Sequence, residues 1–184
     1  QAASASSINK SNLAPVVQKI REQTSGEIPV GVVAPAFNAP QVVDETIDLD
    51  IDFYVADAQW TADPRPDAVL PELATSTAIH VLADTVDRLR HHNKEEMISV
   101  IYRGGIRGGA DAGKAICIGA TAVALGLSAI AGMGFKLISI TSEEELLEKL
   151  QTPLDPADAA KRAENVAKSV VMEVTMLARA CGKS

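Results

Sequence analysis

The sequence predicts an α/β fold in which parallel strands are covered by helices. Short apolar runs alternate with segments whose apolar residues recur at helical spacing. No hairpin signal joins two of the runs, so each predicted strand is followed by a helix that returns the chain to the same edge of the sheet. With 184 residues, of which 47% are hydrophobic, the chain has the size of one folded domain.

The strands are predicted from apolar runs whose lengths suit a buried parallel sheet. They cover 28–33, 52–56, 98–102 and 121–125. The predicted helices cover 11–24, 41–49, a region that ends near 92, 111–118, a short segment after 142, and 156–181. We expect a flexible segment over 1–10, the βα region over 11–140 and a helical extension over 141–184.

Helix ends are marked by capping residues and glycines. Suitable N-caps are Ser11 or Asn12, Ser142 with Glu145 as a capping box, and Asp155 before Pro156. Glycines that stop helices are Gly26, Gly119 and Gly182. The apolar faces of the two longest helices are predicted to comprise Ile79, Leu82, Val86 and Leu89, and Val166, Val170, Val174 and Leu177.

Charge and cysteine content exclude several classes of protein. The net charge of −7 and the lack of a basic cluster argue against nucleic-acid binding. The two cysteines, Cys117 and Cys181, form no disulfide framework or metal-binding pair, which favours the reducing cytoplasm and buried, inert thiols. Met172 and Met176 are expected to pack in the core.

An uncharged stretch over 115–135 is long enough to cross a membrane. It contains glycines at 119, 126, 132 and 134 together with helix-stop and strand signals. We therefore interpret it as a buried parallel strand with glycine-rich flanks.

Two glycine turns follow the third and fourth predicted strands. Gly104 and Gly105 follow one, and Gly126 follows the other. Ligands of α/β folds bind at this edge of the sheet, and glycines let backbone N–H groups approach an anion closely. The helix that opens near Ala110 would add its positive end. The turns thus predict a phosphate cradle, and the alternative is that the glycines only make tight turns.

Other polar residues have weaker signals. Residues 108–115 (GGADAGKA) fit a phosphate-binding loop except that Ala115 replaces the Ser or Thr that would hold magnesium, so nucleotide hydrolysis is not predicted. Candidates for contact with a ligand, each with a plain structural alternative, are Asp57, Trp60, Arg65, Arg103 and Arg107. The histidines, His80, His91 and His92, lack a third metal ligand, so no metal site is predicted.

Residues 103–115 (RGGIRGGADAGKA) and 118–129 (IGATAVALGLSA) resemble the FMN-binding domain of the glutamate synthase family. There the run reads GG[IL]R, an acidic and small helix start, K-A, then L-G-A-D-A-V-x-[IL]-G. Residues 177–184 (LARACGKS) are similar to the closing helix of that family. The resemblance covers the chain from about residue 11 to its end.

The resemblance implies a TIM-type (β/α)8 barrel of which this chain is the second half, with a C-terminal helix. It implies FMN, whose phosphate would lie on Gly104, Gly105, Ile106, Arg107, Gly126, Leu127 and Ser128. In the family the flavin takes electrons from a partner or cluster and reduces a 2-iminoglutarate-type intermediate.

The sequence departs from the family pattern at the reacting end. Val33 stands where the family has a lysine that could stabilise reduced flavin or bind a carboxylate. The loop over 58–66 has no glycine, although the family reads G-G-T-G-A there. The cysteines that hold an iron–sulfur cluster in many members have no counterpart after Gly126, so no cluster is expected in this chain.

Three hypotheses follow. The chain is an FMN-binding oxidoreductase domain or subunit, or a catalytically degenerate relative that serves as a structural or partner-binding subunit. The third, with less support, is an isomerase or lyase that uses the same phosphate cradle. Because about 250 residues are usual for a complete barrel, we expect the missing half from a second copy or another chain. An electron-donor subunit is a further expected partner.

Overall fold

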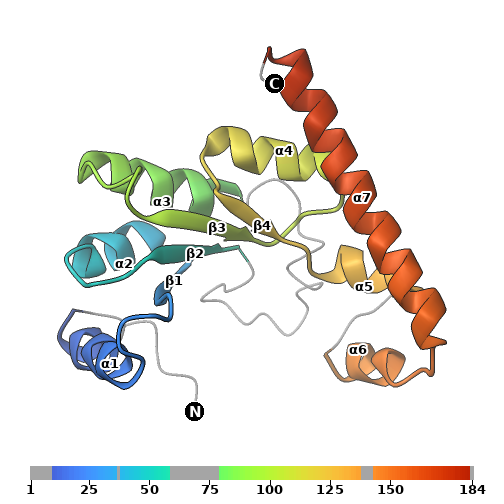
Figure 1. The fold of residues 1–184 in the computed structure, drawn as a ribbon, viewed down its shortest axis with the longest axis horizontal. Coiled ribbons are helices and arrows are strands. Elements are labelled where there is room, and N and C mark those ends of the chain that lie inside the picture. Colours follow the sequence, from blue (N-terminus) through green and yellow to red (C-terminus); the bar gives the residue numbers. More distant parts are fainter. Residues whose placement is uncertain (1–9, 37, 59–78, 138–142, 183–184) are drawn as a thin grey trace.

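A computed structural model describes residues 10–36, 38–58, 79–137 and 143–182 of the chain (Figure 1). Predictions about the first nine residues, the loop that contains Trp60 and Arg65, and Ser142 lie outside these residues. The helices are α1 (Lys10–Gln23), α2 (Ala39–Thr46), α3 (His80–His91), α4 (Gly109–Ile118), α5 (Leu127–Met133), α6 (Glu143–Leu150) and α7 (Pro156–Ala180).

The strands form one parallel sheet in chain order, as predicted. They are β1 (Gly31–Pro35), β2 (Phe53–Asp57), β3 (Ser99–Arg103) and β4 (Ala122–Ala124). Every neighbouring pair is parallel. All strands therefore end at one edge, which we call the carboxyl edge. The last row of register partners there, called the terminal row, consists of Pro35, Asp57, Arg103 and Ala124.

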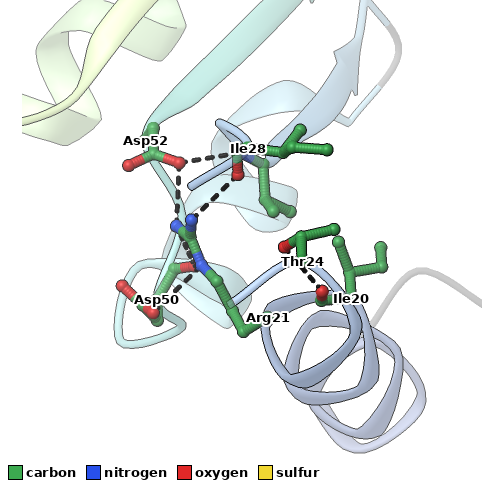
Figure 2. A network of polar contacts seen from close by, with 7 residues as sticks. Ile20, Arg21, Thr24, Ile28, Asp50 and Asp52 are labelled. Carbon is green, nitrogen blue, oxygen red and sulfur yellow. Dashed lines mark hydrogen bonds and ion pairs between the residues drawn. The ribbon is translucent and has the colours of Figure 1, made fainter. Parts of the chain in front are cut away.

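The first strand begins three residues later than predicted, at Gly31 instead of residue 28. Side chains bind the main chain of the preceding residues (Figure 2). The Arg21 guanidinium donates to the Ile28 carbonyl oxygen, and the Val30 N–H donates to the Asp52 carboxylate at 2.7 Å. Because these groups bond to side chains, they do not extend the strand ladder.

The core lies between the sheet and the helices α2 and α3. Helix α2 packs on β1, and α3 packs on β2 and β3. The buried strand residues on this side are Val32, Ala34, Tyr54, Ala56, Val100 and Tyr102. The predicted face of α3 is confirmed, since Leu82, Val86 and Leu89 are buried. Because successive side chains of a strand point to opposite faces, only one face of the sheet packs into this core.

A buried hydroxyl pair joins α2 to the sheet. The Thr46 hydroxyl donates to the Val42 carbonyl oxygen at 2.6 Å and lies 2.8 Å from the Tyr54 hydroxyl. Since the Thr46 proton is already used, Tyr54 is the donor in this pair. Burial raises the pKa of Tyr54 to about 12. The hydrogen bond satisfies both hydroxyl groups, which are costly to bury unpaired.

The opposite face of the sheet is less covered. Val33, Val55 and Ile101 alternate with the core residues and are each partly exposed. Within the described residues, β1 and β4 each pair with only one strand, so both edges of the sheet are open. A sheet that closes into a barrel has no such open edges.

The uncharged stretch over 115–135 does not form one buried strand with glycine flanks. It contains the end of α4, the three-residue strand β4 and the helix α5, which was not predicted. Strand β4 is partly exposed because it lies at the edge of the sheet. Among the described helices, none is both long and apolar enough to cross a membrane.

The last helix, α7, crosses α4 and α5 (Figure 1). It begins as predicted, because the Asp155 side chain accepts a hydrogen bond from the Asp158 N–H. Two of its predicted apolar residues, Val170 and Val174, pack against the core. Three bulky α7 side chains stand over glycines: Val166 over Gly132, Glu173 over Gly109 and Leu177 over Gly113.

Several expectations about single residues were wrong. Met172 and Met176 are 60% and 57% exposed, because they lie on a stripe of α7 that does not face α4 or α5. Cys117 and Cys181 are exposed rather than buried. Ser11 and Asn12 lie inside the first turn of α1, which includes Lys10, so neither precedes the helix as an N-cap.

Candidate functional site

The two predicted glycine turns lie next to each other at the carboxyl edge. Arg103 of β3 and Ala124 of β4 are register partners. Gly104 and Gly105 follow the first of these strands, and Gly126 follows the second within two residues. The topology therefore brings together the residues that the sequence assigned to one site.

The turn after β3 has the conformation that only glycine adopts easily. Gly104 has a φ of 127° and Gly105 a φ of 64°. Ile106 is buried and anchors the turn. Within the described residues, the backbone N–H groups of these three residues have no acceptor. Among the described residues, a Cβ on Gly105 would meet only the Tyr102 hydroxyl, at 3.9 Å, so the described part of the chain leaves the space beside this turn open.

The turn after β4 supplies a polar atom without a partner. Gly126 precedes α5, and Leu127 and Ser128 are the first residues of that helix. The Ser128 hydroxyl oxygen is buried, and it has no hydrogen-bond partner among the described residues. A buried hydroxyl without a partner costs free energy unless a ligand satisfies it. Together with the open turn after β3, it fits an anionic group such as a phosphate.

Arg107 is another predicted phosphate contact, and its guanidinium is bound by a carboxylate four residues further along the chain. Its guanidinium donates to both carboxylate oxygens of Asp111, at 2.8 and 3.2 Å. The hydrogen bond from Arg107 is the largest cause that lowers the pKa of Asp111. Lys114 lies 3.7 Å from the same carboxylate. A phosphate would have to compete with Asp111, and the role of Arg107 stays a prediction.

A carboxylate from α7 occupies the start of α4. The positive end of the helix that opens near Ala110 was expected to face an anionic ligand, and there the Ala110 N–H donates to Glu173 at 3.2 Å. Glu173 is 63 residues away in the sequence, so no local pattern could have indicated it. The positive end of α4 is thus at least partly neutralised by the protein itself.

A second charged pair lies in the terminal row. Arg103 Nη2 is 3.6 Å from Asp57 Oδ2. The sequence indicated both residues separately, but it did not pair them. The signal was available, because each residue directly follows a predicted strand and parallel register places strand ends side by side.

The remaining candidates form other contacts. His92 lies 2.9 Å from the Asp44 carboxylate on α2, at the other side of the core from the glycine turns. His91 and His92 stack edge to face, and no group of three or more metal-ligating side chains occurs in the described part of the chain. Val33, where the family has lysine, lies on the less covered face of the sheet.

The sequence comparisons point to FMN-dependent enzymes. The family model "FMN-dependent dehydrogenase" matches residues 73–139. The archaeal glutamate synthase (NADPH) of Methanocaldococcus jannaschii is 30% identical over 93% of this chain and 35% of that protein. The archaeal-type glutamate synthase of Thermotoga neapolitana is 28% identical over 89% of this chain and 34% of that protein. The chain therefore spans about a third of the length of these relatives.

The solved structures support the fold. A lactate oxidase from Pediococcus acidilactici has a TM-score of 0.55 at 19% identity and covers 89% of this chain and 35% of that chain. A flavocytochrome b2 mutant with pyruvate bound has a TM-score of 0.54 at 18% identity and covers 91% and 34%. Both neighbours are TIM-barrel proteins, so the predicted fold class of parallel (β/α) units of TIM-barrel type is confirmed. In sequence the chain is similar to the FMN-binding domain of glutamate synthases over most of its length, which confirms the predicted resemblance.

Proposed function

We propose that the chain is an FMN-binding, glutamate-synthase-like oxidoreductase domain or subunit. The flavin phosphate would be held by the cradle predicted from the sequence: Gly104, Gly105, Ile106, Arg107, Gly126, Leu127 and Ser128. The observation that carries the proposal is the pairing of an open glycine turn with the buried, partnerless Ser128 hydroxyl at adjacent strand ends. FMN, when bound, would supply electron transfer to or from an organic substrate.

The cradle residues would bind a phosphate mainly through main-chain N–H groups rather than through charged side chains. The N–H groups of Gly104, Gly105 and Ile106 would donate to phosphate oxygens, and the Ser128 hydroxyl would donate a further hydrogen bond. Arg107 is engaged by Asp111, so its contribution would be smaller than that of a free guanidinium. Backbone donors in a turn with positive φ form this kind of anion site.

Substitution of Gly105 by asparagine tests the cradle. Asparagine tolerates the left-handed conformation, so the turn keeps its shape while a side chain fills the open space. We expect the Kd for FMN to rise at least about tenfold, equivalent to about 1.4 kcal/mol. Quenching of flavin fluorescence during titration of the flavin-free chain measures this Kd.

The control for this test is Gly26→Asn. Gly26 also has a positive φ, of 75°, and a Cβ there meets no atom of the described residues within 4 Å. It lies after α1, at the opposite end of the sheet from the cradle. The control is expected to keep the parent affinity. Equal FMN affinity in Gly105→Asn and the parent contradicts the cradle, and a parent chain that takes up no FMN contradicts the proposed function.

The second candidate is a catalytically degenerate relative that acts as a structural or partner-binding subunit. Val33 in place of the family's lysine and the glycine-free loop over 58–66 favour it. Whichever of the two functions the chain has, the open edges of β1 and β4 support a partner that supplies further strands. The partner is a second copy of this chain or a chain that supplies the other half of a barrel. An electron-donor subunit and a cytoplasmic location remain part of the proposal.

The native mass of the purified particle tests the partner. We expect a mass above 19.3 kDa, from a dimer or from a complex with a second chain. An open parallel sheet exposes unpaired main-chain groups at both edges, so completion by further strands lowers the free energy. Light scattering after size-exclusion chromatography measures the mass. A monodisperse monomer over a wide concentration range contradicts this part of the proposal.

A further inference from the structure

Tyr102 is a core residue whose hydroxyl lies next to the glycine turn after β3. It is the fourth residue of the strand and is 3% exposed. Because side chains alternate along a strand, it lies with Val100 on the face of the sheet that packs against the helices. Its hydroxyl oxygen is 3.9 Å from the position that a Cβ on Gly105 would take. The side chain therefore reaches from the core to the turn of the proposed phosphate cradle.

The Tyr102 hydroxyl has no hydrogen-bond partner within the described part of the chain. The chain's other tyrosine, Tyr54, shows the arrangement that is usual for a buried hydroxyl, since it donates to the Thr46 hydroxyl at 2.8 Å. A hydroxyl group that leaves water without gaining a partner costs free energy. Tyr102 thus has a free donor at the edge of the space beside the turn.

The hydroxyl of Tyr102 is a donor throughout the neutral pH range. Its burial, followed by the charge of Asp111, raises the pKa of Tyr102 above its ordinary value of 10.0. A phosphate monoester loses its second proton at about pH 6, so it is mostly a dianion while the tyrosine is still protonated. The nearby Asp111 carboxylate is compensated by the Arg107 guanidinium at 2.8 Å, which reduces its repulsion of an anion.

Other donors of the proposed cradle belong to the same turn and to the adjacent strand end. The main-chain N–H groups of 104–106 follow β3 directly. Tyr102 and Val123 of β4 are register partners, and Gly126 follows Val123 by three residues. Ser128, with its buried hydroxyl, lies in the first turn of α5. An anion at the turn after β3 would therefore meet main-chain donors together with a side-chain hydroxyl from the core.

We propose that the Tyr102 hydroxyl donates a hydrogen bond to the phosphate of a phosphate monoester at the glycine turn, and so selects the phosphorylated ligand over its dephosphorylated form. A hydrogen bond to a charged acceptor is stronger than one between neutral groups. A site with a buried donor discriminates against a ligand that lacks the matching group, because the donor then stays unpaired. The inference rests on the proposed function, which makes FMN the monoester and riboflavin its dephosphorylated form.

Tyr102→Phe tests this assignment, because it removes the hydroxyl and keeps the ring in the core. Quenching of flavin fluorescence, measured separately with FMN and with riboflavin, gives two Kd values for each variant. Tyr102→Phe is expected to raise the Kd for FMN at least about tenfold and to leave the Kd for riboflavin unchanged. The preference for FMN over riboflavin should therefore fall by the same factor.

The matched control is Tyr54→Phe, which removes the other buried tyrosine hydroxyl and its bond to Thr46. It is expected to keep both Kd values and to lower the Tm of the flavin-free chain by about 2–4 °C. Tyr102→Phe should not lower this Tm, because its hydroxyl has no partner among the described residues. A fall in Tm as large as that of Tyr54→Phe, or failure to fold, shows that the hydroxyl has a structural partner and overturns the proposal.

Inorganic phosphate separates this inference from the proposed function. Calorimetric titration of the flavin-free chain, with chloride at equal ionic strength as the comparison anion, is expected to show weaker phosphate binding in Tyr102→Phe than in the parent. If the parent binds phosphate in this Tyr102-dependent way but takes up no FMN, only the proposed function is contradicted.

Three other outcomes overturn the inference. In the first, Tyr102→Phe keeps the parent preference for FMN over riboflavin, which leaves the proposed function intact. In the second, Tyr102→Phe loses affinity for FMN and riboflavin equally, which assigns the hydroxyl to a part of the flavin other than the phosphate. In the third, the parent binds neither FMN nor inorganic phosphate, which contradicts the proposed function as well.

Discussion

Replacement of Gly109 by alanine is expected to loosen the contact between α4 and α7. A Cβ at this position would lie 2.2 Å from the Glu173 Cβ and 2.8 Å from the Val170 carbonyl oxygen. Neither atom is the end of a flexible side chain, so the whole helix α7 has to move. Overpacking of this kind costs about 3 kcal/mol, against at most about 1 kcal/mol that alanine contributes in a helix.

The net loss of about 2 kcal/mol corresponds to a fall in Tm of roughly 4–8 °C for a chain of this size. Urea unfolding followed by circular dichroism measures it. The matched control is the neighbouring Gly108→Ala, because Gly108 has an extended backbone and a Cβ there would be 3.6 Å from Glu173. Equal stability of the two variants would show that α7 adapts to the added methyl group without cost.

Arg21→Ala is expected to destabilise the end of the sheet opposite the carboxyl edge. The Arg21 side chain is 15% exposed and connects α1 to the segments before β1 and β2 (Figure 2). Its guanidinium donates to the Ile28 and Asp50 carbonyl oxygens at 3.1 and 2.9 Å. It also forms ion pairs with the carboxylates of Asp50 and Asp52 at 3.0 and 2.8 Å.

Removal of this group leaves several acceptors without their charged donor, which costs about 2–3 kcal/mol of unfolding free energy. Arg21→Lys should recover only part of it, because a single ammonium cannot serve acceptors on two sides. Lys10→Ala is the control on the same helix, since the Lys10 ion pair with Asp48 is exposed and should contribute little. Chemical unfolding midpoints of the three variants compare these effects.

The effect of Arg21 should also depend on pH. The hydrogen bond from the Val30 N–H, followed by that from Arg21, lowers the pKa of Asp52 below its ordinary 3.8. A lowered pKa in the folded state contributes stability that is present above about pH 4 and lost as the pH falls through the folded-state value. The difference between the parent and Arg21→Ala should therefore narrow below pH 4. A difference that stays constant down to pH 2 would contradict a role for this ion pair.

The sequence was sufficient where the signal is local. The Asp155 cap and the glycine that ends α4, Gly119, act within one helical turn, so their effect can be predicted from neighbouring residues. The four strands and their parallel order also follow from apolar runs separated by helices. The glycine turns came together because parallel strands end at one edge.

The sequence was insufficient where a distant side chain decides the structure. Strand β1 starts late because Arg21 and Asp52 bind the main chain before it, and the start of α4 is capped by Glu173 from α7. Periodicity also could not choose between two apolar stripes of α7, so Met172 and Met176 were assigned to the wrong side. The start of β1, the cap of α4 and the buried face of α7 all depend on segments that are distant in the sequence and become neighbours only in the fold.

The chain order of the sheet has a consequence for how the protein reaches its fold. Each strand pairs with the strand that precedes it in the sequence, so the sheet can grow from β1 to β4 by contacts between nearby units. Because each strand pairs with its neighbour in the sequence, the loops that have to close, and their entropic cost, are smaller than in a sheet whose strands are out of chain order. During synthesis the sheet can assemble as these segments emerge from the ribosome, and α7, which follows them in the chain, then docks on α4 and α5.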